Sequence, residues 1–342
     1  MTAATMPARQ RLDANGNLVV PGFVDAHIHL DKAFLLAKSP AQTGDFSEAL
    51  ATTLQLKKQY TIEDIQVRAR TVLERAIAFG ITAMRSHVEV DPILGITSME
   101  ALLPLKQDYA WGLTLQLAVF AQEGITNQPG TEALLRKAMA MGGNVIGSAP
   151  YVDPDPRRNI EIVFDIAQEF DCDVDFHLDF LDDDAPLQVP MVVEETHKRN
   201  WQGRVCLGHM TKLAGLSPKV LAAIAADLQS AAIAVLALPA SDLYMMSRKD
   251  THNVRRGVAP LNRLQELGVT VGTATNNIQN LFTPFGDGDV LKIGTLLANV
   301  LQLGTTASHE FCLDAVTQNA ARAIGITNYG IAPGCVADLV IL

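Results

Sequence analysis

Eight short apolar runs, each followed by a longer stretch typical of a helix, recur along the whole chain. The runs are Gly22–Ala26, Ile81–Ser86, Thr114–Phe120, Asn144–Ser148, Asp173–His177, Arg204–Gly208, Ala232–Leu238 and Val269–Thr275. Strands that are apolar throughout and alternate with helices indicate a parallel sheet covered on its outer face. Eight such units are the number that a TIM barrel requires. The sequence therefore predicts an α/β fold, a (β/α)8 TIM barrel.

Helical patterns fill the gaps between these runs. The clearest begins at Thr61, where Thr61-x-x-Asp64 resembles a capping box, and it reaches Ala78 before Gly80. The other predicted helices are Leu134–Met141, Ile160–Phe170, Met191–Arg199, Pro218–Gln229, Leu261–Leu267 and Val290–Leu303. A doubly wound open sheet is the structural alternative. No Gly-rich phosphate-binding loop follows the first strand to favour it.

Both ends of the chain carry strand-like runs outside the predicted barrel. We interpret residues 1–20 and 330–342 as remnants of a small β-sandwich domain, a truncated β structure formed by the termini, and residues 21–329 as the barrel. Val336–Leu342 is the clearest of these runs. Such strands leave apolar edges that another subunit could cover, so a homo-oligomer is one expectation.

Charge and composition exclude several classes of partner. Lys and Arg number 27 against 37 Asp and Glu, a net charge of −10 without a basic cluster, so no nucleic acid is expected. The longest apolar stretch, Ala231–Ala240, is too short to span a membrane, and residues 1–20 lack the apolar core of a secretory signal. Four cysteines without CxxC spacing favour free thiols and a cytoplasmic location.

Histidines fall at the ends of several predicted strands. His27 and His29 follow the first strand two residues apart, so both rings can point to one side, while His177 ends the fifth strand and His209 the sixth. His87 ends the second strand, where a substrate-binding or supporting role is predicted. Because the carboxyl ends of barrel strands meet at one mouth, these imidazoles should converge there. Imidazole nitrogens suit zinc or iron(II), and an open coordination position would lower the pKa of a bound water.

The run Val20–Asp31, which reads VPGFVDAHIHLD, resembles the first-strand signature of the amidohydrolase superfamily. From about residue 18 to 342 the chain is similar to the cytosine deaminase branch, which also holds N-isopropylammelide amidohydrolase-like enzymes. Further matching blocks are Arg85–Val90, Phe120–Gly124, His177–Asp179, Gly208–Thr211, Arg248–Thr251, Arg255–Gly257, Asn276–Asn277 and Thr283–Gly286.

The resemblance implies a set of site residues. One divalent metal ion, zinc or iron, would be held by His27, His29 and His177, with an aspartate at the end of strand eight as the family's fourth ligand. His209 would orient the bound water or the leaving region of the substrate. Gln122 matches a glutamine that grips the ring amide of a pyrimidine-like substrate, since a primary amide pairs with a cyclic –NH–C(=O)– edge.

Two positions depart from the family pattern. The proton-shuttling glutamate, three residues after the strand-five histidine, is Phe180 here, and the Asp-Asp pair after strand eight is Asn276-Asn277. An amide oxygen can bind a metal, but it is neutral and a poor base, so a standard cytosine deaminase is not expected. His209 and Asp179 are the predicted catalytic groups, and Phe180 and both asparagines join Gln122 and His87 as predicted substrate-binding residues.

The predicted function is that of a metal-dependent amidohydrolase that acts on a cyclic amide or amidine in a small N-heterocyclic substrate, by deamination or by another C–N hydrolysis. A retired hydrolase scaffold that binds a ligand, with weak or no metal, is an alternative from a different class. A third is a lyase or isomerase that uses the histidines without metal. Near-stoichiometric zinc or iron favours the first reading, and activity that survives chelation favours the third.

Overall fold

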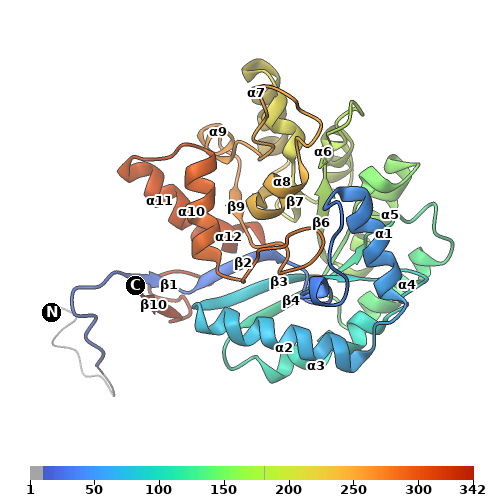
Figure 1. Cartoon of the computed structure of the whole chain (residues 1–342). Helices are drawn as coiled ribbons and strands as arrows, with labels where there is room; N and C mark the ends of the chain where they lie inside the picture. Colours follow the sequence, from blue (N-terminus) through green and yellow to red (C-terminus); the bar gives the residue numbers. More distant parts are fainter. Residues whose placement is uncertain (1–10, 181) are drawn as a thin grey trace.

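A computed structural model describes residues 11–180 and 182–342 of the chain. In this part of the chain eight parallel strands lie in sequence order, each hydrogen-bonded to the next (Figure 1). They are β2 (Phe23–Ile28), β3 (Ile81–Glu89), β4 (Thr114–Ala121), β5 (Val145–Ser148), β6 (Asp173–Leu178), β7 (Val205–His209), β8 (Ala234–Ala237) and β9 (Val271–Thr273). The predicted (β/α)8 TIM barrel is confirmed, and each of the eight predicted runs contains or overlaps one strand.

The barrel closes where the segment after β9 meets the end of β2. Ile28 and Asn276 form a parallel bridge there. The Asn276 backbone N–H donates to the His27 carbonyl at 2.8 Å, and the His29 N–H donates to the Asn276 carbonyl at 2.9 Å. Two of the predicted metal-binding histidines therefore lie on the closing seam, directly beside Asn276.

Helices surround the barrel in the described residues. They are α1 (Phe46–Lys57), α2 (Ile62–Ala78), α3 (Thr97–Asp108), α4 (Thr131–Ala140), α5 (Pro156–Phe170), α6 (Val189–Lys198), α7 (Pro218–Ser230), α8 (Pro239–Met245), α9 (Leu261–Glu266), α10 (Val290–Val300), α11 (Thr306–Asp314) and α12 (Gln318–Ala323). The predicted start of α2 is confirmed, because the Thr61 hydroxyl accepts a hydrogen bond from the Asp64 N–H. The sequence did not predict α1, α3, α8, α11 and α12.

The main apolar core lies between the strands and the helices that cover them. Inside the barrel, the buried side chains include polar and charged ones. Arg85 on β3 donates to the Asp175 carboxylate at 2.8 Å and to the Ile324 carbonyl, just after α12, at 3.0 Å. A buried guanidinium is tolerated when its N–H groups all find acceptors. These contacts join the strands to α12, which packs on β2, β8 and β9.

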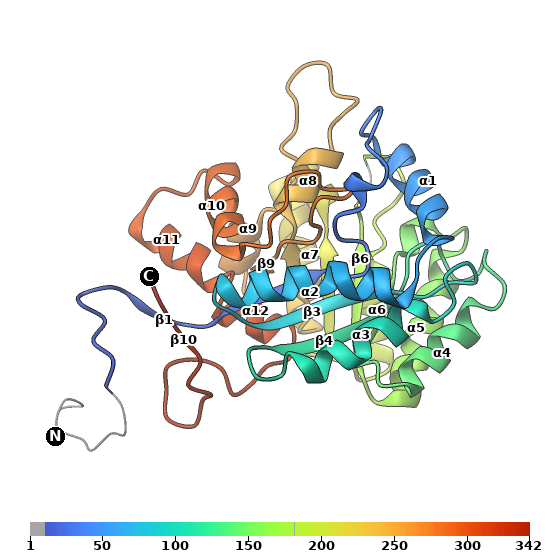
Figure 2. The same cartoon turned by 60° about the horizontal axis from the view of Figure 1, so that its bottom comes forward.

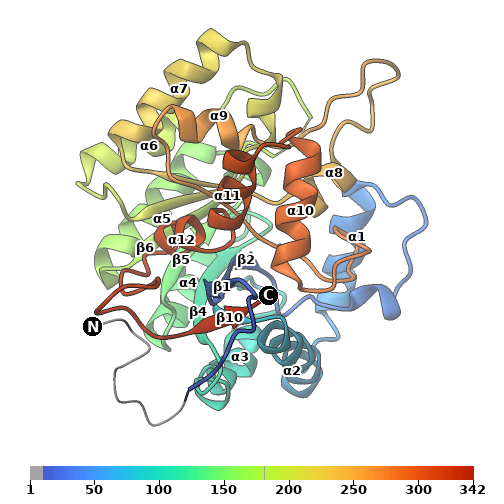
Figure 3. The same cartoon turned by 90° about the vertical axis from the view of Figure 1, so that its left-hand side faces the viewer.

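The two ends of the chain meet in a separate two-stranded sheet. Strand β1 (Val19–Pro21) pairs antiparallel with β10 (Leu339–Ile341), with Val20 opposite Val340 (Figure 3). The termini therefore form a small β structure, as expected. Its interpretation as the remnant of a β-sandwich domain stays a prediction, and residues 1–10 of the predicted segment lie outside the described residues.

The carboxyl ends of the strands lead into the segments that form the mouth of the barrel. Figure 2 shows α1, α8 and the loop between α8 and α9 on one side of the molecule. Among the described residues, no helix combines the length and apolar character needed to cross a membrane.

Candidate active site

A small cavity lies at the carboxyl end of the barrel. Seven of the predicted site residues line it: His29, Gln122, His177, Phe180, His209, Asn276 and Asn277. The remaining lining residues are Lys32, Phe46, Tyr151, Ser241 and Phe282. Residues from distant parts of the sequence thus meet at the end of the barrel where such folds place their chemistry.

Three imidazoles converge at one side of this cavity. The Nε2 atom of His177 lies 3.1 Å from Nε2 of His27 and 3.1 Å from Nε2 of His29. All three rings are buried. Two nitrogens that bind one tetrahedral zinc ion at about 2.1 Å lie about 3.4 Å apart, so the observed spacing fits two pairs of ligands around a common ion.

These three imidazoles sit in surroundings that favour the neutral form. Burial, and then the neighbouring imidazoles, hold the pKa values of His27, His29 and His177 well below the ordinary value for histidine, and Lys32 adds to the effect on His27 and His29. A neutral imidazole keeps a lone pair that can bind a metal ion. The neutral form and the spacing of the rings would suit a metal ion, and the ligand set of His27, His29 and His177 stays a prediction.

Asn276 brings an oxygen to the same place. Its side chain is buried, 2% exposed, and its Nδ2 donates to Ser241 Oγ at 2.8 Å. Its Oδ1 is buried and has no hydrogen-bond partner in the described part of the chain. A buried amide oxygen without a donor is costly, and a cation beside it would remove that cost. The residue present therefore fits a fourth, neutral ligand.

His209 is held by a carboxylate that the sequence analysis missed. The His209 Nδ1 lies 2.7 Å from Asp242 Oδ1, and the other oxygen of Asp242 accepts the Leu238 N–H at 2.9 Å. Burial raises the pKa of Asp242 in spite of the facing imidazole. With Nδ1–H donated to this carboxylate, Nε2 of His209 is left as the acceptor on the cavity side. Asp242 lies five residues beyond β8, in the first turn of α8.

Phe180 covers the His209 ring. It is 3% exposed, and its ring centroid lies 4.1 Å from that of His209. Phe46 and Tyr151 contact it from the other sides at 5.9 Å. At the position where the family pattern has a carboxylate, this chain has Phe180, which packs against other aromatic side chains.

Gln122 and Lys32 add polar groups to the lining of the cavity. Lys32 Nζ donates to Gln122 Oε1 at 3.2 Å and to Glu89 Oε1 at 2.8 Å. This lysine also lies 5.0 Å above the Phe282 ring. The lysine orients the Gln122 oxygen, the Tyr151 hydroxyl hydrogen-bonds to the same amide, and one amide N–H is left for a ligand.

A buried ionic network extends outward from Lys32. Lys57, at the end of α1, contacts Glu89 at 2.7 Å, Asp91 at 2.9 Å and Glu123 at 2.6 Å. Although burial opposes the charge, these carboxylates hold the pKa of Lys57 above its ordinary value. Glu123 is buried enough that its pKa rises to about 7. The lysine fills the space among three carboxylates that a cation would otherwise take.

His87 lies deeper than the sequence indicated. Strand β3 continues to Glu89 rather than ending at Ser86, and this places His87 within the strand. Its ring centroid lies 3.9 Å from that of His27, and its Nε2 lies 3.2 Å from Asp175. His87 does not line the cavity. It packs against the His27 ring, which is the supporting role that the sequence left open.

Asp179 faces away from the cavity. Strand β6 ends at Leu178, and Asp179 has a positive φ of 48° that breaks the alternation of side chains expected for a continued strand. Its two oxygens accept the N–H groups of Gln188 at 2.8 Å and Val189 at 3.2 Å, at the start of α6. Burial raises the pKa of this carboxyl to about 6. The geometry makes Asp179 a cap of α6, so we assign it no catalytic role.

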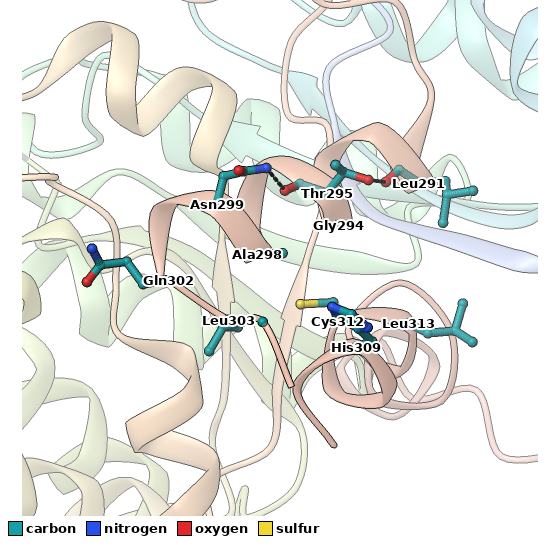
Figure 4. Close-up of a pocket in the computed structure, with 11 residues that line it drawn as sticks. Leu291, Gly294, Thr295, Ala298, Asn299, Gln302, Leu303, His309, Cys312 and Leu313 are labelled. Atoms are coloured by element: carbon teal, nitrogen blue, oxygen red, sulfur yellow. Dashed lines mark hydrogen bonds between the residues drawn. The ribbon is translucent and has the colours of Figure 1, made fainter. Parts of the chain in front are cut away.

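A larger groove lies elsewhere, between α10 and α11 (Figure 4). The polar side chains of Thr295 and Asn299 in it hydrogen-bond to carbonyls of their own helix. His309 and Cys312 reach it from α11, and neither belongs to the candidate site at the barrel mouth.

The sequence analysis missed Ser241, Asp242, Phe46, Tyr151 and Phe282, and it left Lys32 without a role. The signal for Ser241 and Asp242 was available: two polar residues follow an apolar strand within five residues, after Leu238-Pro239-Ala240. The aromatic residues carry no such signal, because isolated aromatic residues in loops and helix starts are usual in any core.

The sequence matches the amidohydrolase family over residues 10–100 and 43–342. The chain belongs to the amidohydrolase family. An N-isopropylammelide isopropyl amidohydrolase of Pseudomonas sp. (strain ADP) is 30% identical over 98% of this chain and 82% of its own length. A pterin deaminase of Rhizobium rhizogenes is 26% identical over 100% of this chain and 78% of its own.

A solved structure resembles this amidohydrolase closely. The 5-methylcytosine deaminase of Klebsiella pneumoniae, liganded with 5-fluorocytosine, superposes with a TM-score of 0.93 at 29% identity, over 100% of this chain and 84% of the other. The predicted membership of the cytosine deaminase and ammelide branch is confirmed, as is the prediction of a hydrolase of C–N bonds other than peptide bonds.

Proposed function

We propose that this amidohydrolase hydrolyses a C–N bond of a small N-heterocycle that carries a cyclic amide or amidine, either at an exocyclic amine or within the ring. The observation that carries the proposal is the convergence of three buried imidazoles beside a cavity that also holds Gln122, His209 and Asn276, whose amide oxygen has no hydrogen-bond partner among the described residues. The named relatives act on ammelide, pterin and methylcytosine compounds, all of which are nitrogen heterocycles.

His27, His29 and His177, with Oδ1 of Asn276, would hold one divalent ion, zinc or iron. When bound, such an ion acts as a Lewis acid and makes a water nucleophilic near neutral pH. Asn276 contributes no charge, so the donor set is neutral throughout. We therefore expect weaker binding of the ion than an aspartate at this position would give.

His209 is the proposed general base. Asp242 fixes the ring and holds the proton on Nδ1, which leaves Nε2 facing the cavity as proton acceptor. Phe180 packs against the same ring, and it keeps water away from that side of the imidazole. His209 thus takes over proton transfer from the carboxylate that the family carries at the position of Phe180.

Gln122 and the aromatic residues of the cavity would hold the heterocyclic ring of the substrate. Gln122 can donate an N–H to a ring carbonyl while Lys32 orients its amide oxygen. Phe46, Tyr151 and Phe282 provide flat apolar walls that suit a planar substrate. A cytoplasmic location and a homo-oligomeric state stay predictions.

The test is a screen of the metal-reconstituted protein. The protein is loaded with Zn²⁺ or Fe²⁺ and incubated with a panel of cyclic amides and aminated heterocycles, while ammonia, amine release and ring opening are followed by mass spectrometry. We expect near-stoichiometric metal and turnover of at least one compound, both lost on chelation. Protein that takes up no metal and turns over no compound would favour a ligand-binding protein instead. Turnover that resists chelation would favour metal-free lyase or isomerase chemistry.

A further inference from the structure

Asn276 poses a problem that an aspartate would not. A carboxylate offers two equivalent oxygens, whereas an amide has an oxygen at one end and an NH2 group at the other. Rotation of the amide by half a turn would direct the NH2 group at the cation and abolish binding. A chain that uses asparagine as a ligand must therefore fix which end faces the site.

Ser241 supplies an acceptor for the NH2 end. Asn276 Nδ2 donates to Ser241 Oγ at 2.8 Å, and Asn277 Nδ2 lies 3.4 Å from the same oxygen. Ser241 is 1% exposed, so water does not compete for these contacts. Thr283 Oγ1 is a further hydrogen-bond partner of this hydroxyl.

Backbone donors fix the orientation of the Asn280 amide and, through it, that of Asn277. The N–H groups of Phe282 and Thr283 donate to Asn280 Oδ1 at 2.9 and 3.1 Å, which fixes the orientation of the Asn280 amide. Asn280 Nδ2 then donates to Asn277 Oδ1 at 2.7 Å. Asn277 is therefore turned with its NH2 group toward Ser241, and the same serine receives the NH2 group of Asn276.

We propose that Ser241 is a positioning residue that makes Asn276 present its oxygen, and not its NH2 group, to the cation. The buried Oδ1 without a partner is the end of this relay. The inference rests on the proposed function, because it takes Asn276 as a ligand. It goes further in assigning a role to a serine that would be unnecessary beside a carboxylate.

Metal affinity measured by chelator competition tests the relay without recourse to activity. Ser241→Ala should weaken zinc binding about 10- to 100-fold, the usual effect of removing a partner that orients a ligand. In an Asn276→Asp background the same substitution should change the affinity less than about 3-fold, since either carboxylate oxygen can bind. Asn276→Asp alone should tighten zinc. Ser148→Ala removes another buried hydroxyl, one bonded to Asn159, and should leave the affinity unchanged.

The outcomes separate the two proposals. If Asn276→Ala leaves zinc affinity unchanged, Asn276 is not a ligand, and both the ligand set and the role of Ser241 are wrong. If Asn276→Ala weakens zinc but Ser241→Ala does not, only the role of Ser241 is wrong. A Ser241→Ala penalty that persists undiminished in the Asn276→Asp background would also overturn that role, because it would reflect a general loss of packing. Thermal unfolding of each metal-free variant shows whether the barrel remains folded.

Discussion

Two groups of buried polar side chains meet at the same end of the barrel, and they differ in how fully they are paired. The imidazole cluster consists of His27, His29, His177 and Asn276. The ionic network consists of Lys32, Lys57, Glu89, Asp91 and Glu123. In the cluster, Nε2 of His177 faces the Nε2 atoms of His27 and His29 at 3.1 Å, and Oδ1 of Asn276 has no hydrogen-bond partner among the described residues. In the network, both lysines contact carboxylates at 2.6 to 2.9 Å.

This difference indicates that the imidazole cluster serves to bind a ligand, whereas the ionic network serves to stabilise the fold. Buried polar groups that pair with one another stabilise the fold, whereas buried groups left without partners indicate that something else binds there. Lys32 joins the two groups, because it lines the cavity and contacts Glu89. We therefore expect substitutions in the cluster to affect metal binding and turnover, and substitutions in the network to affect the free energy of unfolding.

The largest effect is expected from His177→Ala. Removing the ring that contacts both other imidazoles should lower zinc affinity and turnover by more than about 100-fold, beyond what loss of an orienting partner causes. Metal analysis after dialysis and steady-state kinetics measure this. His197→Ala, which removes an exposed histidine on α6, is the control and should change neither. Full metal content in His177→Ala would contradict the proposal that the imidazole cluster binds the metal ion.

Lys57→Met should chiefly affect folding. The substitution leaves three buried carboxylates without their common partner, which costs about 3–5 kcal/mol in the free energy of unfolding. Urea unfolding of the metal-free protein measures it. Lys58→Met, at the exposed neighbouring position, should cost less than about 0.5 kcal/mol. Equal stability of the two variants would show that the network is not a structural support.

Asp242→Asn should lower kcat about 10- to 100-fold while metal content stays unchanged. The substitution keeps the shape of the side chain but removes the anion that holds the proton on Nδ1 of His209. Single-turnover kinetics with a fixed metal load measure the change. An unaltered kcat would mean that His209 does not act as the base.

The smallest effect concerns pH. Burial raises the pKa of Glu123 from its ordinary value of 4.5 to about 7, so between these values the folded protein holds a proton that the unfolded chain has released. The free energy of unfolding should therefore fall as pH rises from about 4.5 to 7. Glu123→Gln should reduce this slope without removing it, since the pKa of Asp31 is also raised, to about 6, by burial. Urea unfolding at several pH values measures this pH dependence. An unchanged slope in Glu123→Gln would contradict the raised pKa of Glu123.

The sequence placed two residues of the candidate site wrongly because it misjudged where strands end. The predicted second strand stopped three residues short of the true end of β3, which placed His87 at the mouth when it lies behind His27. Asp179 was expected to share the side of His177, but its positive φ turns the carboxylate toward α6. Apolar patterns locate strands well and their ends poorly, because the last residues depend on hydrogen bonds to a neighbour that the local sequence does not reveal.

The sequence by itself determined the eight alternating units, the placement of His27, His29, His177 and His209 at strand ends, and the two departures at Phe180 and Asn276. These follow from local patterns, since strand character and residue type are both properties of short segments. Only the tertiary structure decided that Asp242 holds His209, that Ser241 turns the amide of Asn276, and that Lys57 occupies the space among three carboxylates. Each of these depends on side chains brought together across the barrel mouth from separate elements, at distances that no spacing along the chain encodes.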